Sequence, residues 1–427
     1  HAEALELNRH LLEQTPQNFL SYTENYWRVW VNKNEIDFAD LSPEIVELFK
    51  RSLLVIRNQT DNDGAILAAN DSDVTMRATD HYSYLWTRDG AFVAHALDLA
   101  NYSHLTGKFY EMCGKLIHAD GYFLQKYNAD GTVASGWHAA WDFQANKKLV
   151  PIQEDETALV IWAFWKHYDR YRNIEFIRKL YRPLILRAAD FMKNFRHRSG
   201  LPAPSWNLWE DQRGIHTFTC AAVVGGLRAA ANFANLFGEA ERAADYEQAA
   251  DEIVAAMREH LYSRKHKRFL RSFEFHGDQY SEPDATVDAS LFGTFYFDAF
   301  DAKDEMVGQT MRAVERHLWI DTETGGVARF ENDNYMRSAE NAPSNAWFIC
   351  TLWLADYRIA IAESKEDLRG ALEISEWTTK RALPSGVLAE QVNPLDGSPA
   401  SVAPLTWSHS TFVATVMNYL HKLRQFK

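Results

Sequence analysis

The stretch at residues 82–99, YSYLWTRDGAFVAHALDL, shows the arrangement on which the fold prediction depends. Aromatic and charged residues come first, and apolar residues then continue along one helical face through Val93, Ala96 and Leu97. The stretch therefore predicts a polar loop that runs directly into a helix over 89–105. Other loops rich in polar and aromatic residues also lie just before predicted helices, at 135–144, 151–157, 202–214, 321–345 and 384–409.

Helical spacing of apolar residues dominates the rest of the chain, and strand signals are few. Short runs at 63–68, 72–77 and 121–133 predict hairpins, with Asp-Gly pairs at 63–64 and 130–131 marking turns. The class is therefore all-α with about a dozen helices, arranged as a toroid of helix pairs or as an irregular bundle. Further helices are predicted at 18–31, 43–57, 155–170, 173–181, 183–198, 215–237, 239–262, 287–299, 302–318, 342–362, 364–380 and 408–424.

Six helix pairs without sequence repeats fit an (α/α)6 barrel, although periodicity alone does not separate that barrel from other α folds. In such a barrel the long loops would gather at one end. Function commonly lies on loops that a rigid scaffold holds in place. We therefore expect the active-site residues in these loops.

The composition disfavours several classes of partner. The 427 residues carry 45 basic and 58 acidic side chains, a net charge of −13, which repels nucleic acid and polyanionic substrates. No run approaches the roughly 18 apolar residues that a membrane span needs, so no membrane partner is expected. A neutral substrate rich in hydroxyl groups remains compatible with this charge.

Cysteine usage indicates neither a disulfide framework nor a metal site. Cys113, Cys220 and Cys350 are far apart and odd in number, and no His or Cys spacing matches a zinc site. We expect three buried thiols, no metal and no cofactor. Free cysteines and the lack of a leader favour the cytoplasm, although a trimmed terminus would hide a leader.

The first candidate for chemistry is LWEDQRG at 208–214. Trp206 and Trp209 lie close to Glu210, and the low polarity of tryptophan raises the pKa of a neighbouring carboxyl group. A raised pKa is what a general acid needs at neutral pH. The alternative is a surface loop with an ordinary solvated Glu-Asp pair.

The second candidate is LAEQVNP at 388–394, followed by SVAPLTWSHS at 401–410. Glu390 lies among apolar neighbours, far along the chain from Glu210. Two isolated carboxyl groups from distant loops are the groups that glycoside hydrolysis uses. The alternative is a helix-capping network that involves Ser408 and His409.

The third candidate is YSYLWTRDG at 82–90. The Arg88 guanidinium and the Asp89 carboxylate together suit two vicinal hydroxyl groups, and Tyr82, Tyr84 and Trp86 offer stacking surfaces for a sugar ring. The alternatives are helix-dipole compensation by Asp89 and a simple core role for the rings.

Two weaker groups are PIQEDETAL at 151–159 and GGVARFENDNYM at 325–336. The first carries three carboxyl groups before a helix, where dipole compensation is the ordinary explanation. The second places Arg329 on a loop made flexible by glycine, where an exposed surface arginine is the ordinary explanation. Phosphate-binding, dinucleotide-binding and Gly-x-Ser-x-Gly motifs are absent.

Taken together, these strings resemble the catalytic domain of glycoside hydrolase family 15, which contains glucoamylases, glucodextranases and some trehalases. The motifs run in order from about Tyr82 to Ser410. The resemblance is to the prokaryotic type, and it implies an (α/α)6 barrel, an inverting mechanism and exo attack on a terminal glucose. It also implies that no metal or cofactor is needed.

The resemblance assigns roles to individual residues. Glu210 matches the general acid and Glu390 the general base. Tyr82 matches a tyrosine that helps to hold the attacking water, and Ser408 matches a serine that orients the base. The remaining matches are to substrate-binding positions: Trp86, Arg88, Asp89, Trp137, Leu208, Trp209, Asp211, Arg329 and Trp347.

Departures from the family pattern affect the expected specificity. Fungal relatives carry a second Glu after the acid, where this chain has Asp211, and the stretch from Gln153 to Asp155 also differs from the fungal loop. The linkage preference, α-1,4 or α-1,6, therefore stays open. An α,α-trehalase of the same family and a non-catalytic glucan-binding protein are the alternative functions.

The domain organisation follows from the same resemblance. Residues 34–427 are expected to form the barrel. Residues 1–33 resemble the helical linker that follows an N-terminal β-sandwich in prokaryotic relatives. A β-sandwich missing from this chain is therefore expected as a possible partner domain.

Overall fold

The structure is a computed structural model that describes residues 2–70, 80–143, 146–273, 275–276, 279–280 and 283–426. The chain forms two compact units, His1–Leu41 and Ser42–Lys427. The first unit contains helices α1 (Ala2–Glu13) and α2 (Pro16–Asn32). The Thr15 side chain caps α2, and Pro16 occupies its first turn, where the missing N–H costs nothing. The sequence predicted α2 and missed α1.

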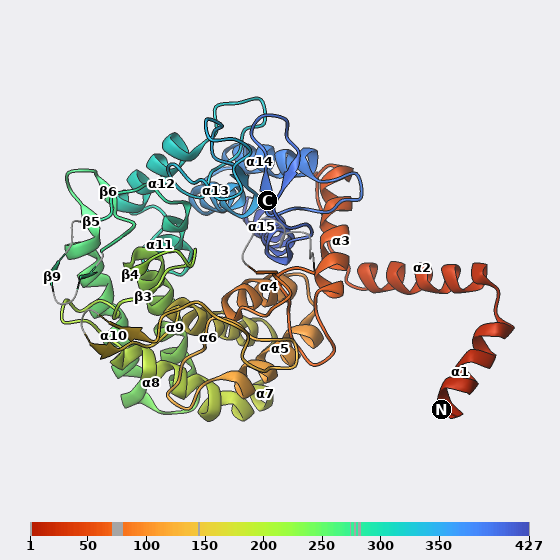
Figure 1. Cartoon of the computed structure of the whole chain (residues 1–427), viewed down its shortest axis with the longest axis horizontal. Coiled ribbons are helices and arrows are strands. Elements are labelled where there is room, and N and C mark those ends of the chain that lie inside the picture. The colour runs from red at the N-terminus through yellow and green to blue at the C-terminus, as the bar shows by residue number, and fades with distance from the viewer. Residues whose placement is uncertain are drawn as a thin grey trace. The chain divides into compact units, whose positions relative to one another are not determined.

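The second unit is an (α/α)6 barrel, as predicted. Its inner helices pack side by side in chain order, and α15 packs against α4 to close the ring (Figure 1). The six inner positions are α4 (Thr87–Leu99), α6 (Glu154–Tyr171), α9 (Thr217–Leu236), α11 (Gly293–Tyr296) with the preceding 3-10 helix η4 (Ala289–Phe292), α13 (Phe348–Ile361) and α15 (Thr406–Arg424).

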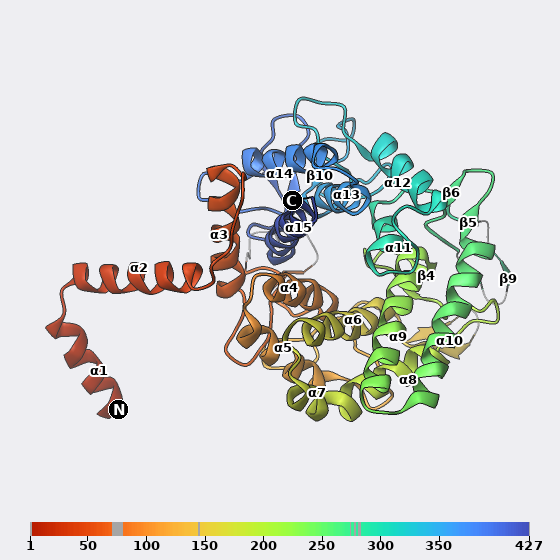
Figure 2. The same cartoon turned by 180° about the vertical axis from the view of Figure 1, so that it is seen from behind.

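Outer helices alternate with the inner ones along the chain and cover them from outside (Figure 2). One outer position is built from three consecutive pieces, α7 (Ile174–Leu180), the π-helix η2 (Tyr181–Leu186) and α8 (Arg187–Asn194). The other outer helices are α3 (Pro43–Asn58), α5 (Ser103–Leu116), α10 (Ala240–Ala256) with the π-helix η3 (Met257–Leu261), α12 (Glu305–Leu318) and α14 (Arg369–Arg381) after the 3-10 helix η5 (Glu366–Leu368).

Small residues bring the inner helices close together. A Cβ atom on Gly226 of α9 would lie 2.9 Å from the carbonyl oxygen of Ala158 in α6, so this contact requires glycine. The α9 sequence TFTCAAVVGGLRAAANFANL is buried on nearly every side, as expected for a helix inside a double ring.

The strands are short and lie in the connecting loops. They are β1 (Trp141–Asp142), β2 (Lys147–Lys148), β3 (Ser205–Trp206), β4 (Arg213–His216), β5 (Tyr262–Ser263), β6 (Arg268–Phe269), β7 (Ser272–Phe273), β8 (Phe275–His276), β9 (Gln279–Tyr280), β10 (Ala346–Trp347), β11 (Gln391–Val392) and β12 (Pro399–Ala400). Two three-stranded sheets, β3-β4-β7 and β10-β11-β12, matter for the site because they support the loops with Glu210 and Glu390.

Several boundaries differ from the sequence predictions. The helix expected at 89–105 ends at Leu99, and α5 begins at Ser103, because Asn101 adopts a left-handed backbone conformation with φ 68°. The segment expected as a helix at 287–299 forms only η4 and α11. Isolated bridges support the hairpins at 63–68 and 121–133, whereas 72–77 lies outside the described residues.

The three cysteines are free and buried, as predicted. No described helix is both long enough and apolar enough to cross a membrane.

Candidate active site

A cavity of about 530 Å³ lies at the end of the barrel where the inner helices begin. The loops before α4, α9, α13 and α15 all contribute to its wall. Of the predicted site residues, the cavity brings together Tyr82, Trp86, Arg88, Asp89, Trp137, Leu208, Trp209, Glu210, Asp211, Arg329, Trp347 and Glu390. Residues separated by more than 300 positions therefore meet in one pocket.

Glu210 lies in the turn between β3 and β4, whose residues Trp206 and Arg213 are paired. Its backbone is left-handed, with φ 64°, a conformation that costs a non-glycine residue free energy and that also occurs at active sites. The Trp86 indole donates to Oε1 at 2.6 Å, and the Gln125 amide donates to Oε2 at 2.9 Å. Burial raises the pKa of the Glu210 carboxyl group, and the Arg88 charge and the Trp86 hydrogen bond oppose this rise.

Glu390 immediately precedes β11, which pairs with β10 through Trp347 and Gln391. Its side chain is buried, and the Gln391 amide donates to Oε2 at 2.9 Å. Burial raises the pKa of Glu390, while hydrogen bonds from Ser401, Gln391 and Tyr82 and the Arg329 charge lower it. The carboxylate therefore has donors on its protein side and faces the cavity.

Ser408 contacts the backbone next to Glu390 and not its carboxyl group. Its hydroxyl donates at 2.8 Å to the carbonyl oxygen of Ala389, and it does not belong to the described residues that line the cavity. The serine therefore fixes the backbone immediately before Glu390, because it lies on the buried face of α15.

Arg88 is almost fully committed to protein partners. Its Nε donates to Asp89 at 3.1 Å, and its Nη1 lies 3.0 Å from Gln153, 3.2 Å from Asp155 and 3.1 Å from Glu156. Burial raises the pKa of Glu156 to about 8, against the Arg88 charge. Asp155 and Glu156 thus hold Arg88 in place, a role beyond dipole compensation. Arg88 and Asp89 both line the cavity, and Arg88 positions the Asp89 carboxylate.

Arg329 is buried and forms a two-pronged ion pair with Asp333, at 2.9 and 2.8 Å. Its guanidinium also lies 4.8 Å from the centroid of Trp347 and 5.3 Å from those of Trp209 and Tyr335. Such cation–π contacts fix the cation and the rings together. The surface alternative for Arg329 is therefore wrong.

The residues on either side of Glu210 are also held in place by contacts with other parts of the chain. The Trp209 indole donates to both oxygens of Asp288, at 3.1 and 3.0 Å, and Asp288 pairs with Arg271 at 3.0 Å. Arg271 also contacts Asp211, at 3.3 Å, which places one cation between the two carboxylates. This network supports the wall of the cavity next to Glu210.

Sequence reasoning missed several residues of the site. Tyr335 shares a 2.8 Å hydrogen bond with Tyr82, and Asp80 and Trp407 also line the cavity. Gln125 and Lys126 belong to a predicted hairpin that carried no chemical assignment. Tyr335 and Trp407 had a signal in the sequence, because both lie in stretches already singled out, 325–336 and 401–410.

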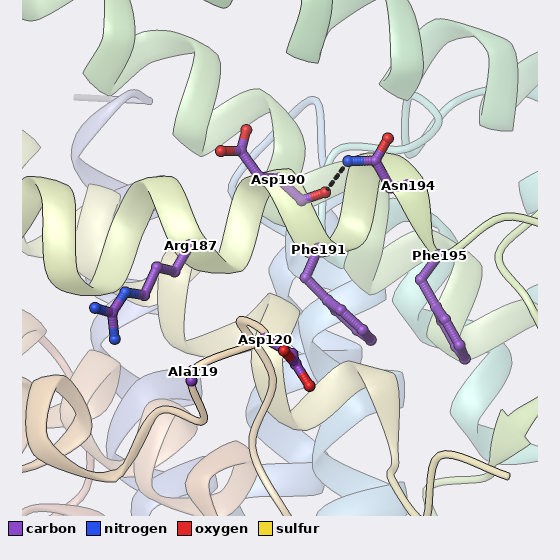
Figure 3. A pocket seen from close by; sticks show the side chains of 7 residues that line it. All are labelled: Ala119, Asp120, Arg187, Asp190, Phe191, Asn194 and Phe195. Atoms are coloured by element: carbon purple, nitrogen blue, oxygen red, sulfur yellow. Dashed lines mark hydrogen bonds between the residues drawn. The ribbon is translucent and has the colours of Figure 1, made fainter. Parts of the chain in front are cut away.

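A second hollow of about 450 Å³ lies on the outer surface along α8 (Figure 3). The Asn194 amide there donates to the Asp190 carbonyl oxygen at 2.7 Å, and the Asp190 carboxylate accepts from Tyr246. Phe191 and Phe195 stack with centroids 4.9 Å apart. The two carboxylates of this hollow, Asp120 and Asp190, are solvent-exposed and lie beside His118 and Arg242. The barrel cavity, which brings Glu210 and Glu390 together, is therefore the candidate active site.

Comparison with known proteins agrees with this geometry. The description "Glycosyl hydrolases family 15" matches residues 50–417. The chain belongs to this family. Its members are glycoside hydrolases, and the match covers all of the inner helices except the last residues of α15.

Two curated relatives span nearly the whole chain. An uncharacterized glycosyl hydrolase of Methanocaldococcus jannaschii is 26% identical over 423 residues, covering 95% of this chain and 62% of the relative. A glucoamylase of a Clostridium species is 22% identical over 446 residues, covering 96% of this chain and 58% of the relative. The chain thus spans about three fifths of the length of these relatives.

Solved structures confirm the (α/α)6 fold. A bacterial glucoamylase complexed with acarbose has a TM-score of 0.76 at 20% identity, covering 100% of this chain and 64% of that one. The glucoamylase of Saccharomycopsis fibuligera has a TM-score of 0.71 at 15% identity, covering 93% of this chain and 98% of that one.

Proposed function

We propose that this family 15 protein is an inverting, exo-acting α-glucoside hydrolase that releases β-glucose from the non-reducing ends of α-glucans or oligosaccharides. The observation that carries the proposal is that Glu210 and Glu390, from loops 180 positions apart, line one cavity. Both curated relatives are named as glycosyl hydrolases or glucoamylases, which supports the same class of reaction.

Glu210 acts as the general acid. Burial raises its pKa, which favours retention of the proton that a general acid must deliver. The protonated oxygen donates to the glycosidic oxygen as the bond to the anomeric carbon breaks. The leaving sugar then departs with its hydroxyl group restored, and Glu210 is left as a carboxylate that Trp86 and Gln125 stabilise.

Glu390 acts as the general base. Its carboxylate takes one proton from a water molecule, whose oxygen attacks the anomeric carbon from the face opposite the leaving group. Inversion needs about 6.5–9.5 Å between the two carboxyl groups, so that this water fits between them. The hydroxyl groups of Tyr82 and Tyr335 lie on the side of Glu390 and help to hold the water.

The closed end of the cavity supports exo action. Asp89 lines it with a side chain that is only 12% exposed, and Arg88 behind it is 4% exposed. Asp89 can accept hydrogen bonds from hydroxyl groups of a terminal glucose. A glucan chain cannot continue through this wall, so only chain ends reach the two carboxyl groups.

An anomer-resolved proton NMR assay tests the proposal. Maltose, isomaltose, maltotriose and trehalose are each incubated with the protein, and the first glucose released is assigned as α or β. We expect the first glucose released from maltose, maltotriose or isomaltose to be β-glucose. We expect no internal fragments from a longer glucan. First release of α-glucose, or internal cleavage, would contradict the proposal, and cleavage of trehalose alone would replace it with a trehalase.

A further inference from the structure

We propose that Lys126 is a positioning residue for this reaction: its buried ammonium group holds the wall that carries the acid and sets the charge that Glu210 experiences. The proposal rests on the proposed function, because it takes Glu210 as the general acid. Lys126 does not line the cavity among the described residues. It would therefore act through other groups rather than on the substrate.

The surroundings of Lys126 form an aromatic cage with one carboxylate. Its side chain has no exposed surface, and Nζ lies 2.8 Å from Oδ2 of Asp80. The ammonium nitrogen also lies 4.3 Å from the centroid of Tyr84, 4.4 Å from Trp137 and 5.3 Å from Trp86. Burying a charged group costs free energy unless the charge is paired. The presence of a lysine at this buried position therefore calls for a specific explanation.

The cage contacts the acid through two neighbours. Gln125, next to Lys126 in the chain, donates to Oε2 of Glu210, and Trp86, a wall of the cage, donates to Oε1. Leu85 and Tyr127 exchange two backbone hydrogen bonds of 2.8 Å, which aligns Trp86 with the segment at 125–126. Both donors to Glu210 are thus attached to the elements that surround the Lys126 ammonium.

Charged groups approach Glu210 from several elements, and Lys126 is one of two cations among those that act on it. The other, Arg88, is surrounded by three carboxyl groups of α4 and α6, whereas the ion pair of Lys126 within the described part of the chain is with Asp80. The titratable groups on the elements that surround Glu210 are Asp80, Tyr82, Arg88, Asp89, Lys126, His138, Asp155, Glu156, Asp211, Arg329 and Glu390.

The direction of the effect follows from these charges. Burial raises the pKa of Glu210, and the positive charge of Lys126 lowers it. Loss of the lysine charge therefore raises this pKa, whereas loss of the Asp80 charge lowers it. A purely structural role would change activity or stability at every pH without moving the titration of Glu210 in these opposite directions.

The experiment compares Lys126→Met, Asp80→Asn, the double variant and Lys126→Arg. In Lys126→Met we expect the basic limb of the pH profile of kcat/KM on the best α-glucoside to move up by about 0.5–1 pH unit. In Asp80→Asn it should move down. In the double variant the basic limb should lie close to that of the parent. In Lys126→Arg it should stay at the parental pH, because arginine keeps the positive charge.

Lys108→Met is the matched control. Lys108 is an exposed lysine of α5 that donates to the backbone of Asn62, so its replacement should leave the limb in place. A second readout does not depend on turnover: the side-chain carboxyl carbon of Glu210 is titrated by NMR in protein labelled with 13C-glutamate. The Glu210 signal is assigned by its loss in Glu210→Gln.

The outcomes separate this inference from the proposed function. If the Glu210 resonance titrates as stated but no α-glucoside is cleaved by the parent, the charge coupling stands and the proposed function fails. The inference is overturned if the parent cleaves α-glucosides but Lys126→Met and Asp80→Asn shift neither the basic limb of the pH profile nor the titration of the Glu210 resonance. Should Lys126→Met fail to fold, a downward shift in Asp80→Asn still supports the inference, and no shift overturns it.

Discussion

Glu210 and Glu390 line the same cavity, but the chain supports them in different ways. Glu210 lies at the tip of a strained turn, and the donors to its two oxygens, Trp86 and Gln125, come from other parts of the chain. Glu390 is buried, and its donor Gln391 is the next residue along a short sheet. Glu210 therefore depends on donors from distant segments, whereas Glu390 has one donor from the adjacent residue in addition to its distant neighbours.

The largest effect should come from removing either carboxyl group. Glu210→Gln and Glu390→Gln should each lower kcat/KM on an oligosaccharide by about 10²–10⁴-fold, because each loses a proton-transfer step. With α-glucosyl fluoride, whose leaving group needs no proton, Glu210→Gln should recover much of its rate and Glu390→Gln should not. Equal losses on both substrates would contradict the division into acid and base. Unchanged circular dichroism is the control for folding.

The next effect tests the long-range support of the acid. Trp86→Phe removes the 2.6 Å hydrogen bond to Glu210 but keeps an aromatic ring. A hydrogen bond to a charged group contributes about 1.5–3 kcal/mol, so kcat should fall by about 10–100-fold. Since this bond lowers the pKa of Glu210, the basic limb of the pH profile should move upward. A limb that stays in place would show that the indole does not act on the acid.

A smaller effect concerns stability and pH. Burial raises the pKa of Glu156 to about 8 from an ordinary value of 4.5. The stabilisation of the folded chain that comes from protonation of Glu156 is fully present below about pH 4.5, and it is lost as the pH rises toward 8. Glu156→Gln, which resembles the protonated form, should therefore gain in unfolding midpoint relative to the parent between pH 5 and pH 8.

Thermal unfolding at several pH values checks this prediction, with Asp155→Asn as the matched variant. Asp155 pairs with the same Arg88, and burial also raises its pKa, so Asp155→Asn should likewise gain in midpoint relative to the parent as the pH rises. A relative stability of Glu156→Gln that falls as the pH rises would show that Glu156 is ionised in the folded chain.

The smallest effect is expected on the outer surface. Arg187→Ala lies in the hollow along α8 (Figure 3), and Arg187 does not line the cavity that holds the two carboxyl groups. Exposed substitutions of this kind usually change stability by less than about 0.5 kcal/mol. Activity on α-glucosides and on insoluble starch should both stay at the parental level, and a selective loss on starch would indicate a second glucan contact there.

Local signals in the sequence predicted the all-α class and singled out both carboxyl groups as candidates, whereas the (α/α)6 barrel was predicted from the family resemblance. Periodicity marks long helices, and tryptophans beside Glu210 mark a carboxyl group of altered acidity. The helix α5 was missed although Asn101 offered a stop signal, since apolar spacing continued past it. The two-residue strands were missed because they are too short for any alternation to appear.

The supporting groups of the site could not be predicted, because their partners are distant in sequence. Lys126 meets Asp80 across 46 positions, Arg88 meets Gln153 across 65, and Tyr82 meets Tyr335 across 253. From the sequence alone, a lysine in a hairpin is expected to be exposed to solvent, because the three rings that surround Lys126 are not apparent there. Such contacts follow from the tertiary fold alone.

The contact between α15 and α4 has a consequence for synthesis on the ribosome. The last inner helix brings Leu405 and Trp407 to the cavity and completes the ring against the first. A nascent chain that lacks α15 leaves α4 without its neighbour, so the cavity is complete only once α15 has been translated. A polypeptide released after Glu390 but before the end of α15 would carry both carboxyl groups without a complete cavity around them.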